Sequence, residues 1–285
     1  MPLSRETLRE AYEDACRLEI EALKPGNVHV FAGGHRMSAA QFLESARVSS
    51  SPLTDPTLPV GRRMLGAVRA TRRAVATNTN LGIVLLCGPI IKAAELSPDD
   101  LRAGLNSVLA GLDMDDTHAV FEAIVAASPG GLGSADGNDV REEPKTPLVE
   151  AMREAAGRDL IARQYANGFS DVFGVGLPAI EASRAAGETG MWPAIRAYMA
   201  FLTTFPDSHV ARKHGEQTAR ELRDEAAAFQ ASLETDPDED TRIQRLMTLD
   251  AYLKARGINP GTSADLTVAS LLVHIAFHQL AQAQG

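Results

Sequence analysis

Apolar residues recur every three or four positions along most of the chain, which is the spacing of one face of an α-helix. The first such segment can be capped by Ser4 or Thr7, because short hydroxyl side chains accept hydrogen bonds from the first free amides of a helix. The stretch "KPGNVHVFAGGHRMS" then ends it, since Pro and Gly fit poorly inside a helix. The apolar face of this first helix consists of Leu8, Ala11, Tyr12, Ala15, Leu18 and Ala22.

The same periodicity predicts further helices, separated by stretches rich in Pro, Gly and Asp. The longest irregular stretch, 128–147, is either a linker or a functional loop. Because the sequence contains neither an alternating strand pattern nor a repeat, we expect an all-α fold, a multi-helix bundle forming a single domain over 1–285. The expected helices are 38–50, 60–76, Leu81–Leu96, 98–112, 115–127, 148–165, Glu216–Leu233, 238–256 and 264–282, with two more flanking "AAGETGMW".

Composition narrows the class of protein. Hydrophobic residues make up 45% and charged residues 23% of the chain, as in ordinary globular proteins. The net charge of −9 argues against a general nucleic-acid partner. Cys16 and Cys87 fall in apolar helical patterns, so we expect buried, reduced thiols. The polar N-terminal segment is unlike a signal peptide, and the longest apolar run is too short to span a bilayer. We therefore expect a cytoplasmic protein without a membrane partner.

The common nucleotide and zinc signatures are absent from the sequence. It contains no G-x-x-x-x-G-K-[ST] loop, no G-x-G-x-x-G after a strand, no H-E-x-x-H and no C-x-x-C. Any phosphate chemistry must therefore use a less common scaffold. The candidate chemistry lies in five polar breaks, each beside the end of a predicted helix.

Two of these breaks contain groups that suit phosphate. In "EALKPGNVH", the rigid turn at Gly26 presents Lys24, which either binds phosphate or is a solvated lysine favoured by the helix dipole. In "TNTNLG", Asn78 and Thr79 either cap the next helix or lie beside free amides that attract an anion. Gly82 would let a ligand approach the backbone closely.

A third break, "SADGNDV", places Asp136 and Asp139 three residues apart in a glycine-rich loop. Such carboxylates suit Mg²⁺, which usually takes one or two carboxylates together with phosphate oxygens. The alternative is a polar turn, because Asp and Asn favour turns in any case. The rival acidic cluster "DMDD" coincides with a helix start, so capping explains it better.

The last two breaks lie in the C-terminal half. "DSHVARKHG" contains His209, Arg212 and Lys213; such a basic group either binds a polyphosphate or forms a solvated turn. In "GINPGTSADLT", Thr262 and Asp265 match a capping box at a helix start, while the preceding Pro-Gly shapes a tight loop. His274 and His278 follow at helical spacing, where core packing is the favoured interpretation.

Taken in order, these segments resemble the triphosphoribosyl-dephospho-CoA synthase family. The similar elements are "KPGNV", "GGHRM", "TNTNLG", "SPGGLG", "DLIARQYANGFSDVF" and "NPGTSADL", which together span nearly the whole chain. Each element is short, and the specificity comes from their fixed order. The resemblance implies an all-α fold and a transferase that joins ribose C1′ of ATP to 3′-dephospho-CoA with release of adenine.

The resemblance also implies ATP as a substrate, Mg²⁺, and small-molecule nucleotide and cofactor-precursor partners; a homo-oligomer is compatible with it. Loss of adenine leaves positive charge at C1′, which a carboxylate can stabilise, and the acceptor hydroxyl needs a base. The candidate catalytic residues are His35, Asp171, Asp207 and His209. The candidate ATP-binding residues are Lys24, Gly26, Asn78, Thr79, Gly82, Arg212, Lys213 and Ser263. The candidate metal ligands are Asp136 and Asp139.

The sequence departs from the family pattern at two places. Arg36 stands where an Asp is expected, and Asn80 and Leu81 stand where His and Lys are expected. These departures favour a different acceptor, such as a pterin-ribitol precursor of a methanopterin-type cofactor, as an alternative. Two further hypotheses are a non-catalytic nucleotide-binding protein, which would release no adenine, and a helical phosphohydrolase, which would release phosphate or pyrophosphate.

Overall fold

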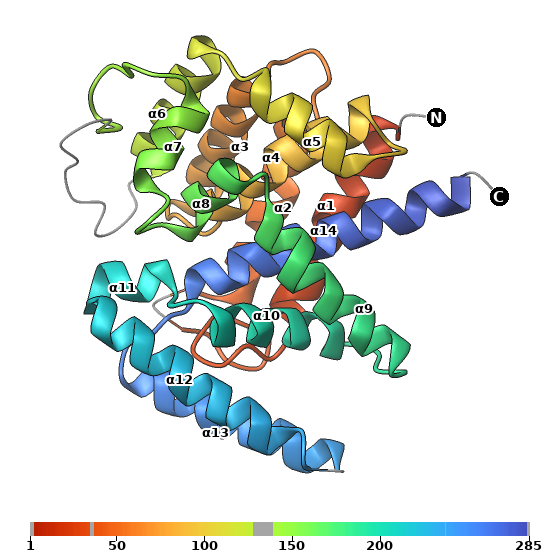
Figure 1. The fold of residues 1–285 in the computed structure, drawn as a ribbon, viewed down its shortest axis with the longest axis vertical. Helices are drawn as coiled ribbons and strands as arrows, with labels where there is room; N and C mark the ends of the chain where they lie inside the picture. The colour runs from red at the N-terminus through yellow and green to blue at the C-terminus, as the bar shows by residue number, and fades with distance from the viewer. Residues whose placement is uncertain (1–2, 35–36, 128–138, 237, 284–285) are drawn as a thin grey trace.

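Fourteen α-helices and one π-helical turn form the part of the chain that the computed structural model describes, residues 3–34, 37–127, 139–236 and 238–283 (Figure 1). Those residues contain no strand, which confirms the predicted all-α fold; two isolated β-bridges lie in the loop before α2. The elements are α1 (Arg5–Glu21), α2 (Ala39–Leu53), α3 (Val60–Val75), α4 (Leu81–Leu96), α5 (Leu101–Ala110), α6 (Met114–Ala127), α7 (Leu148–Ala155), α8 (Leu160–Asn167), η1 (Val172–Gly176), α9 (Leu177–Ala185), α10 (Trp192–Thr204), α11 (Ser208–His214), α12 (Glu216–Leu233), α13 (Glu239–Ala255) and α14 (Gly261–Ala283).

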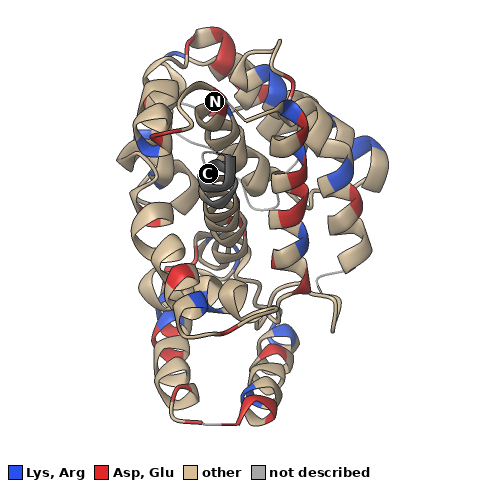
Figure 2. Cartoon of the chain, turned by 90° about the vertical axis from the view of Figure 1, so that its right-hand side faces the viewer, with Lys and Arg blue, Asp and Glu red and all other residues tan. Residues whose placement is uncertain are grey.

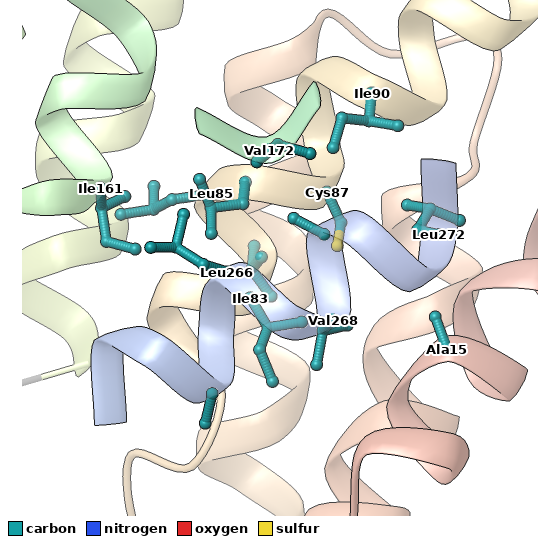
Figure 3. Close-up of a cluster of buried hydrophobic side chains, with 14 of the residues drawn as sticks. Ala15, Ile83, Leu85, Cys87, Ile90, Ile161, Val172, Leu266, Val268 and Leu272 are labelled. Atoms are coloured by element: carbon teal, nitrogen blue, oxygen red, sulfur yellow. The ribbon is translucent and has the colours of Figure 1, made fainter. Parts of the chain in front are cut away.

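The last helix, α14, passes through the middle of the molecule, with α3 to α8 on one side and α10 to α13 on the other (Figure 1). It packs against α1, α4 and α10. Both α14 and α4 are apolar on nearly every face, which is typical of buried helices. Side chains from α1, α4, α8, η1 and α14 meet in one hydrophobic cluster (Figure 3). Cys87 belongs to this cluster, and both cysteines are buried and free, as predicted.

The outer helices carry the charge. Figure 2 shows Lys and Arg interleaved with Asp and Glu along them, including the two helices that project at the bottom of the view, α12 and α13. Some charged pairs are exceptions, because they lie inside the fold. The Arg63 guanidinium of α3 is fully buried and makes two hydrogen bonds to the Glu95 carboxylate of α4, at 2.6 and 2.9 Å.

Three predicted boundaries were wrong, and each difference affects the site. The expected helix 148–165 is interrupted after Ala155 and begins again at Leu160, because Asp159 caps a new helix by accepting from the Ile161 and Ala162 amides. The segment predicted as a break around Pro206 contains α11, which Asp207 caps in the same way. Finally, α14 begins at Gly261, so Thr262 lies inside the helix and does not cap it.

No single helix among the described residues is both long and apolar enough to cross a membrane. Helices α4 and α5 meet the length and composition criteria only as a pair, and they are bent by 114° where they join. The buried residues of α4 include every position from Ile83 to Ile91. Its apolar character is therefore explained by packing inside the protein.

Candidate functional site

A cavity of about 820 Å³ opens where the N-terminal ends of α4, α8 and α14 converge. Its size is in the range of small-molecule and cofactor sites, which are typically largely apolar with a few placed polar groups. Apolar lining comes from α4, α6, α7 and α8. Of the predicted site residues, the cavity is lined by Asn78, Thr79, Gly82, Asp139, His209, Arg212 and Lys213.

The start of α4 leaves amide groups available on the cavity wall. Asn78, two residues before the N-cap residue Asn80, accepts a hydrogen bond from the Leu81 amide at 3.1 Å, so it satisfies the first amide of this helix. The next two amides, of Gly82 and Ile83, have no acceptor among the described residues. Free amides at a helix start carry partial positive charge and attract anions. Capping and ligand binding are thus compatible in this segment.

Thr79 has a structural contact of its own. Its hydroxyl lies 2.6 Å from that of Ser45 on α2, and Ser45 in turn donates to the Gln41 carbonyl. Asn80 points away from the cavity lining, where its amide nitrogen donates to Ser49 at 3.2 Å. Of the two residues in this segment that depart from the family pattern, Asn80 is buried in a contact with α2. The other, Leu81, lines the cavity.

Hydrogen bonds hold the starts of α8, α11 and α14 together. Ser208 accepts from the Leu160 amide and contacts the Thr262 hydroxyl, at 3.2 and 3.0 Å. Asp207 caps α11 and accepts from both the amide and the hydroxyl of Ser263, at 2.8 and 2.9 Å. Asp207 is fully buried; burial raises its pKa, and these donors oppose the rise. Asp207 and Ser263 therefore do not line the cavity, and their contacts position its wall instead of a ligand.

Four basic side chains line the cavity: Arg72, Arg158, Arg212 and Lys213. Arg212 lies 3.5 Å from the Asp159 carboxylate. Lys213 is largely exposed and has no ion-pair partner among the described residues. The loss of some of its hydration, together with the neighbouring Arg212 charge, lowers its pKa. We call the exposed side formed by Arg158 and Lys213 the mouth. A polyanion entering there would meet several cations at once.

Two carboxyl groups of the lining come from inner helices. We call the part of the lining formed by Glu19 of α1 and Asp265 of α14 the floor. Burial raises the pKa of Glu19, and the Lys24 ammonium group, 3.1 Å away, opposes that rise. Burial also raises the pKa of Asp265 well above its usual range, reinforced by the nearby negative charge of Glu19, Asp207 and Asp159. The site thus combines cations near its opening with carboxyl groups in its interior.

Lys24 does not line the cavity, although the sequence made it a phosphate candidate. It is completely buried behind Glu19 and also donates to the Val28 carbonyl at 2.7 Å. Gly26, at φ +83°, forms a turn whose amide donates to Asp250. The Lys-Pro-Gly segment therefore supports the floor from behind. A phosphate role for Lys24 does not fit this burial, because a phosphate could not reach its ammonium group without displacing Glu19.

Asp171 also lies away from the cavity. Its carboxylate accepts hydrogen bonds from Arg163, Gln164 and Asn167, between 2.7 and 3.3 Å. These donors lower its pKa although burial works against them. They close the turn between α8 and η1, which explains this acidic residue structurally. The expectation that Asp171 acts at the reacting carbon is not supported by its position.

Of the remaining predicted catalytic residues and metal ligands, two line the cavity and two lie outside the described residues. His209 lines the cavity, and its Nδ1 lies 3.3 Å from the Arg212 guanidinium. Asp139 lines it as well and accepts a hydrogen bond from the Arg141 amide. His35 and Asp136 lie outside the described residues. The described residues contain no group of three or more His, Cys, Asp or Glu side chains arranged to hold a metal ion.

Sequence reasoning missed the residues of the floor. Asp265 was attributed to a capping box, yet the Thr262 hydroxyl instead accepts from the His209 amide. A better signal was available, since Asp265 is the only Asp, Glu, Lys or Arg in the 23 residues of α14. Glu19 likewise occupies the apolar face of α1, four residues after Ala15. A lone charge on a buried face is expensive unless it has a function or a partner.

Two asparagines that line the cavity were also missed. Asn27 and Asn259 belong to the two Pro-Gly loops, and the side-chain Nδ2 of Asn27 donates to the side-chain Oδ1 of Asn259 at 2.8 Å. The Asn27 Oδ1 atom is buried and has no hydrogen-bond partner among the residues that the structure describes. The loops themselves are in contact, because Gly26 packs so closely on Pro260 that an added Cβ would lie 3.0 Å from its ring.

A deep cavity with basic groups at its mouth and carboxyl groups on its floor is the kind of site found in an enzyme that acts on a phosphorylated small molecule. The family model described as ATP:dephospho-CoA triphosphoribosyl transferase matches residues 5–283. The chain therefore belongs to this family of transferases.

Individual relatives agree with the family. A Pseudomonas fluorescens (strain Pf0-1) protein named as a 2-(5''-triphosphoribosyl)-3'-dephosphocoenzyme-A synthase is 30% identical over 230 residues, covering 78% of this chain and 68% of that protein. A Pseudomonas syringae pv. tomato protein of the same name is 26% identical, covering 83% and 71%. The crystal structure of a triphosphoribosyl-dephospho-CoA synthase from Archaeoglobus fulgidus has the same fold, with a TM-score of 0.63, 23% identity, and coverage of 82% and 98%.

Proposed function

We propose that this protein transfers the triphosphoribosyl group of ATP to a hydroxyl of 3′-dephospho-CoA and releases adenine. The observation that carries the proposal is the single cavity in which cations, free helix amides and carboxyl groups converge. The cations and the free helix amides suit the triphosphate of ATP. Departure of adenine leaves positive charge at C1′, which is favourable close to carboxyl groups.

The triphosphate would bind between the mouth and the start of α4. Lys213 and Arg212 supply cations from α11, and the Gly82 and Ile83 amides supply neutral donors from α4. Arginine suits this task because its planar guanidinium can make two parallel hydrogen bonds to one phosphate. Asp159 keeps Arg212 oriented along the cavity wall.

Mg²⁺ would bind through Asp139 and the phosphate oxygens. The ion commonly uses only one or two protein carboxylates and takes its other ligands from phosphate and water, so a single cavity-lining carboxylate fits such a complex. When bound, the ion would neutralise part of the triphosphate charge. Removing it with a chelator should then lower ATP binding.

The reaction itself gives the direct test. Purified protein is incubated with ATP, Mg²⁺ and 3′-dephospho-CoA, adenine is quantified by chromatography, and the coupled product is identified by mass. We expect one adenine for each coupled product and no release of phosphate or pyrophosphate. Adenine without coupling, or phosphate release without adenine, would contradict the proposal. Parallel reactions with a pterin-ribitol acceptor test the alternative acceptor.

Replacing Lys213 with alanine should raise the KM for ATP by about tenfold, which is the usual effect of losing one hydrogen bond to a charged group. The kcat should change little, because the contact is made equally in the ground and transition states. Steady-state kinetics at two salt concentrations measures both constants. Lys145→Ala is the matched control, since Lys145 is an exposed lysine that does not line the cavity; an equal rise in both variants would count against a specific contact.

A further inference from the structure

Asp265 differs from every other carboxyl group that lines the cavity. Glu19 is paired with Lys24, Asp159 with Arg212, and the remaining acidic residues of the lining also have hydrogen-bond donors. Within the described residues, Asp265 has neither a hydrogen bond nor an ion pair. A carboxyl group without a partner in the interior of a cavity is free to interact with a ligand.

The position of Asp265 is fixed by close packing between two helix starts. Its side chain lies against Gly82 of α4, where a Cβ atom would come within 2.1 Å of Oδ2 and 2.6 Å of Cγ. The absence of a side chain at position 82 therefore makes room for this carboxyl group. The same glycine carries one of the two free amides of α4, so Asp265 lies beside the region proposed for the substrate.

The surroundings of Asp265 favour its neutral, protonated form. After burial, the main cause of its raised pKa is the negative charge of Glu19 on α1, followed by Asp207 before α11 and Asp159 before α8. Arg212 of α11 opposes this effect, as does the positive end of α4, whose effect is confined to its first turn. The buried thiols of Cys16 and Cys87 are also close, and their own raised pKa values keep them neutral.

We propose that Asp265 is the general acid that protonates the leaving adenine, a role that rests on the transfer reaction proposed above. As the N9–C1′ bond breaks, its electron pair passes to the purine, and the Asp265 carboxyl proton goes to a ring nitrogen of adenine. The acceptor oxygen forms the new bond to C1′ and loses its proton. That proton returns the Asp265 carboxylate to its protonated form. One proton thus moves from the acceptor hydroxyl to adenine, and the atoms balance.

A neutral carboxylic acid inside a cavity suits this role better than a carboxylate. Adenine is a poor leaving group as an anion, and a positioned acid typically accelerates such a step by about 10²- to 10⁴-fold. Proteins keep such acids protonated near neutral pH by placing them in apolar surroundings or next to another carboxyl group. The floor of this cavity does both.

The test compares Asp265→Asn with the wild type on two donors, ATP and its N7-methylated form, whose base leaves without needing a proton. We expect the variant to lose about 10²- to 10⁴-fold in kcat with ATP, and less than about tenfold with the methylated donor. Asp240→Asn is the control, because it makes the same side-chain replacement at an exposed residue in the first turn of α13, away from the cavity. An equal loss on both donors would overturn the acid role.

A second measurement requires only the wild type, which covers the case in which the variant does not fold. Because the acid must be protonated, kcat/KM with ATP should fall as pH rises through the pKa of Asp265, and this fall should be absent with the methylated donor. The same alkaline fall on both donors would overturn the role. If the wild type releases no adenine from ATP, the transfer reaction itself fails, and the role of Asp265 fails with it.

Discussion

Replacing Gly82 with alanine is expected to reduce transfer activity by at least about a hundredfold, the lower end of what a positioned acid contributes, without unfolding the protein. The added Cβ would lie 2.1 Å from Oδ2 and 3.2 Å from the Cβ of Asp265. The carboxyl group must therefore rotate out of place or α4 must move away from α14. Either change separates the proposed acid from the proposed phosphate site.

The stability of this variant should change much less than its activity. Gly82 has ordinary helical geometry, since it is not among the residues with positive φ. Alanine at a helical position is favoured over glycine by about 1 kcal/mol, which offsets part of the steric cost. Thermal unfolding and steady-state kinetics on the same preparation separate the two effects. The control is Gly174→Ala, because a Cβ there meets no atom within 4 Å. Full activity in Gly82→Ala would contradict the packing argument.

The second large effect concerns stability. Removing the Glu95 side chain as Glu95→Ala should lower the free energy of unfolding by about 3–5 kcal/mol, because it leaves a buried guanidinium without its counter-charge. Arg63 is fully buried, and besides Glu95 only the Leu58 carbonyl accepts from it among the described residues, at 2.9 Å. Denaturant unfolding followed by circular dichroism gives the free energy directly.

A matched pair on the same helix provides the control. Arg69 of α3 is paired with Glu122 of α6, and both side chains are about half exposed, at 48%. Exposed ion pairs contribute roughly 0–1 kcal/mol, so Glu122→Ala should change stability by no more than that. If both glutamate variants lost the same stability, burial would not be the cause.

The helices could be predicted from the sequence where an apolar face or a cap acts locally. The start of α4 is an example, because Asn78 accepts from the first amide of the helix, only three residues further on. The division between α7 and α8 was missed because the periodicity continues across it. What breaks the helix is the Asp159 cap, whose second oxygen faces Arg212, 53 residues further along the chain. Local patterns carry no information about such a partner.

In the site, too, local signals could be predicted from the sequence and distant contacts could not. The polar breaks beside predicted helix ends contain Asn78, Arg212 and Lys213, and all three line the cavity, while their binding of ATP stays a prediction. Lys24 was misjudged because its environment is set by Glu19 and by burial, neither of which a turn motif reveals. Asp265 was missed for the opposite reason, since a local capping pattern seemed to explain it. Only packing against Gly82, which lies far away in the sequence, shows where its carboxyl group lies.

The contact between the two Pro-Gly loops links activity to the order of synthesis. Gly26 is hydrogen-bonded to Asp250, and Asn27 to Asn259, which is 232 positions later. Contacts so distant in sequence form late, because a long loop must close before they contribute stability. A chain still on the ribosome and lacking α14 therefore has no complete cavity. On the function proposed above, a chain in which the two loops and α14 have not come together would lack a complete site for the nucleotide.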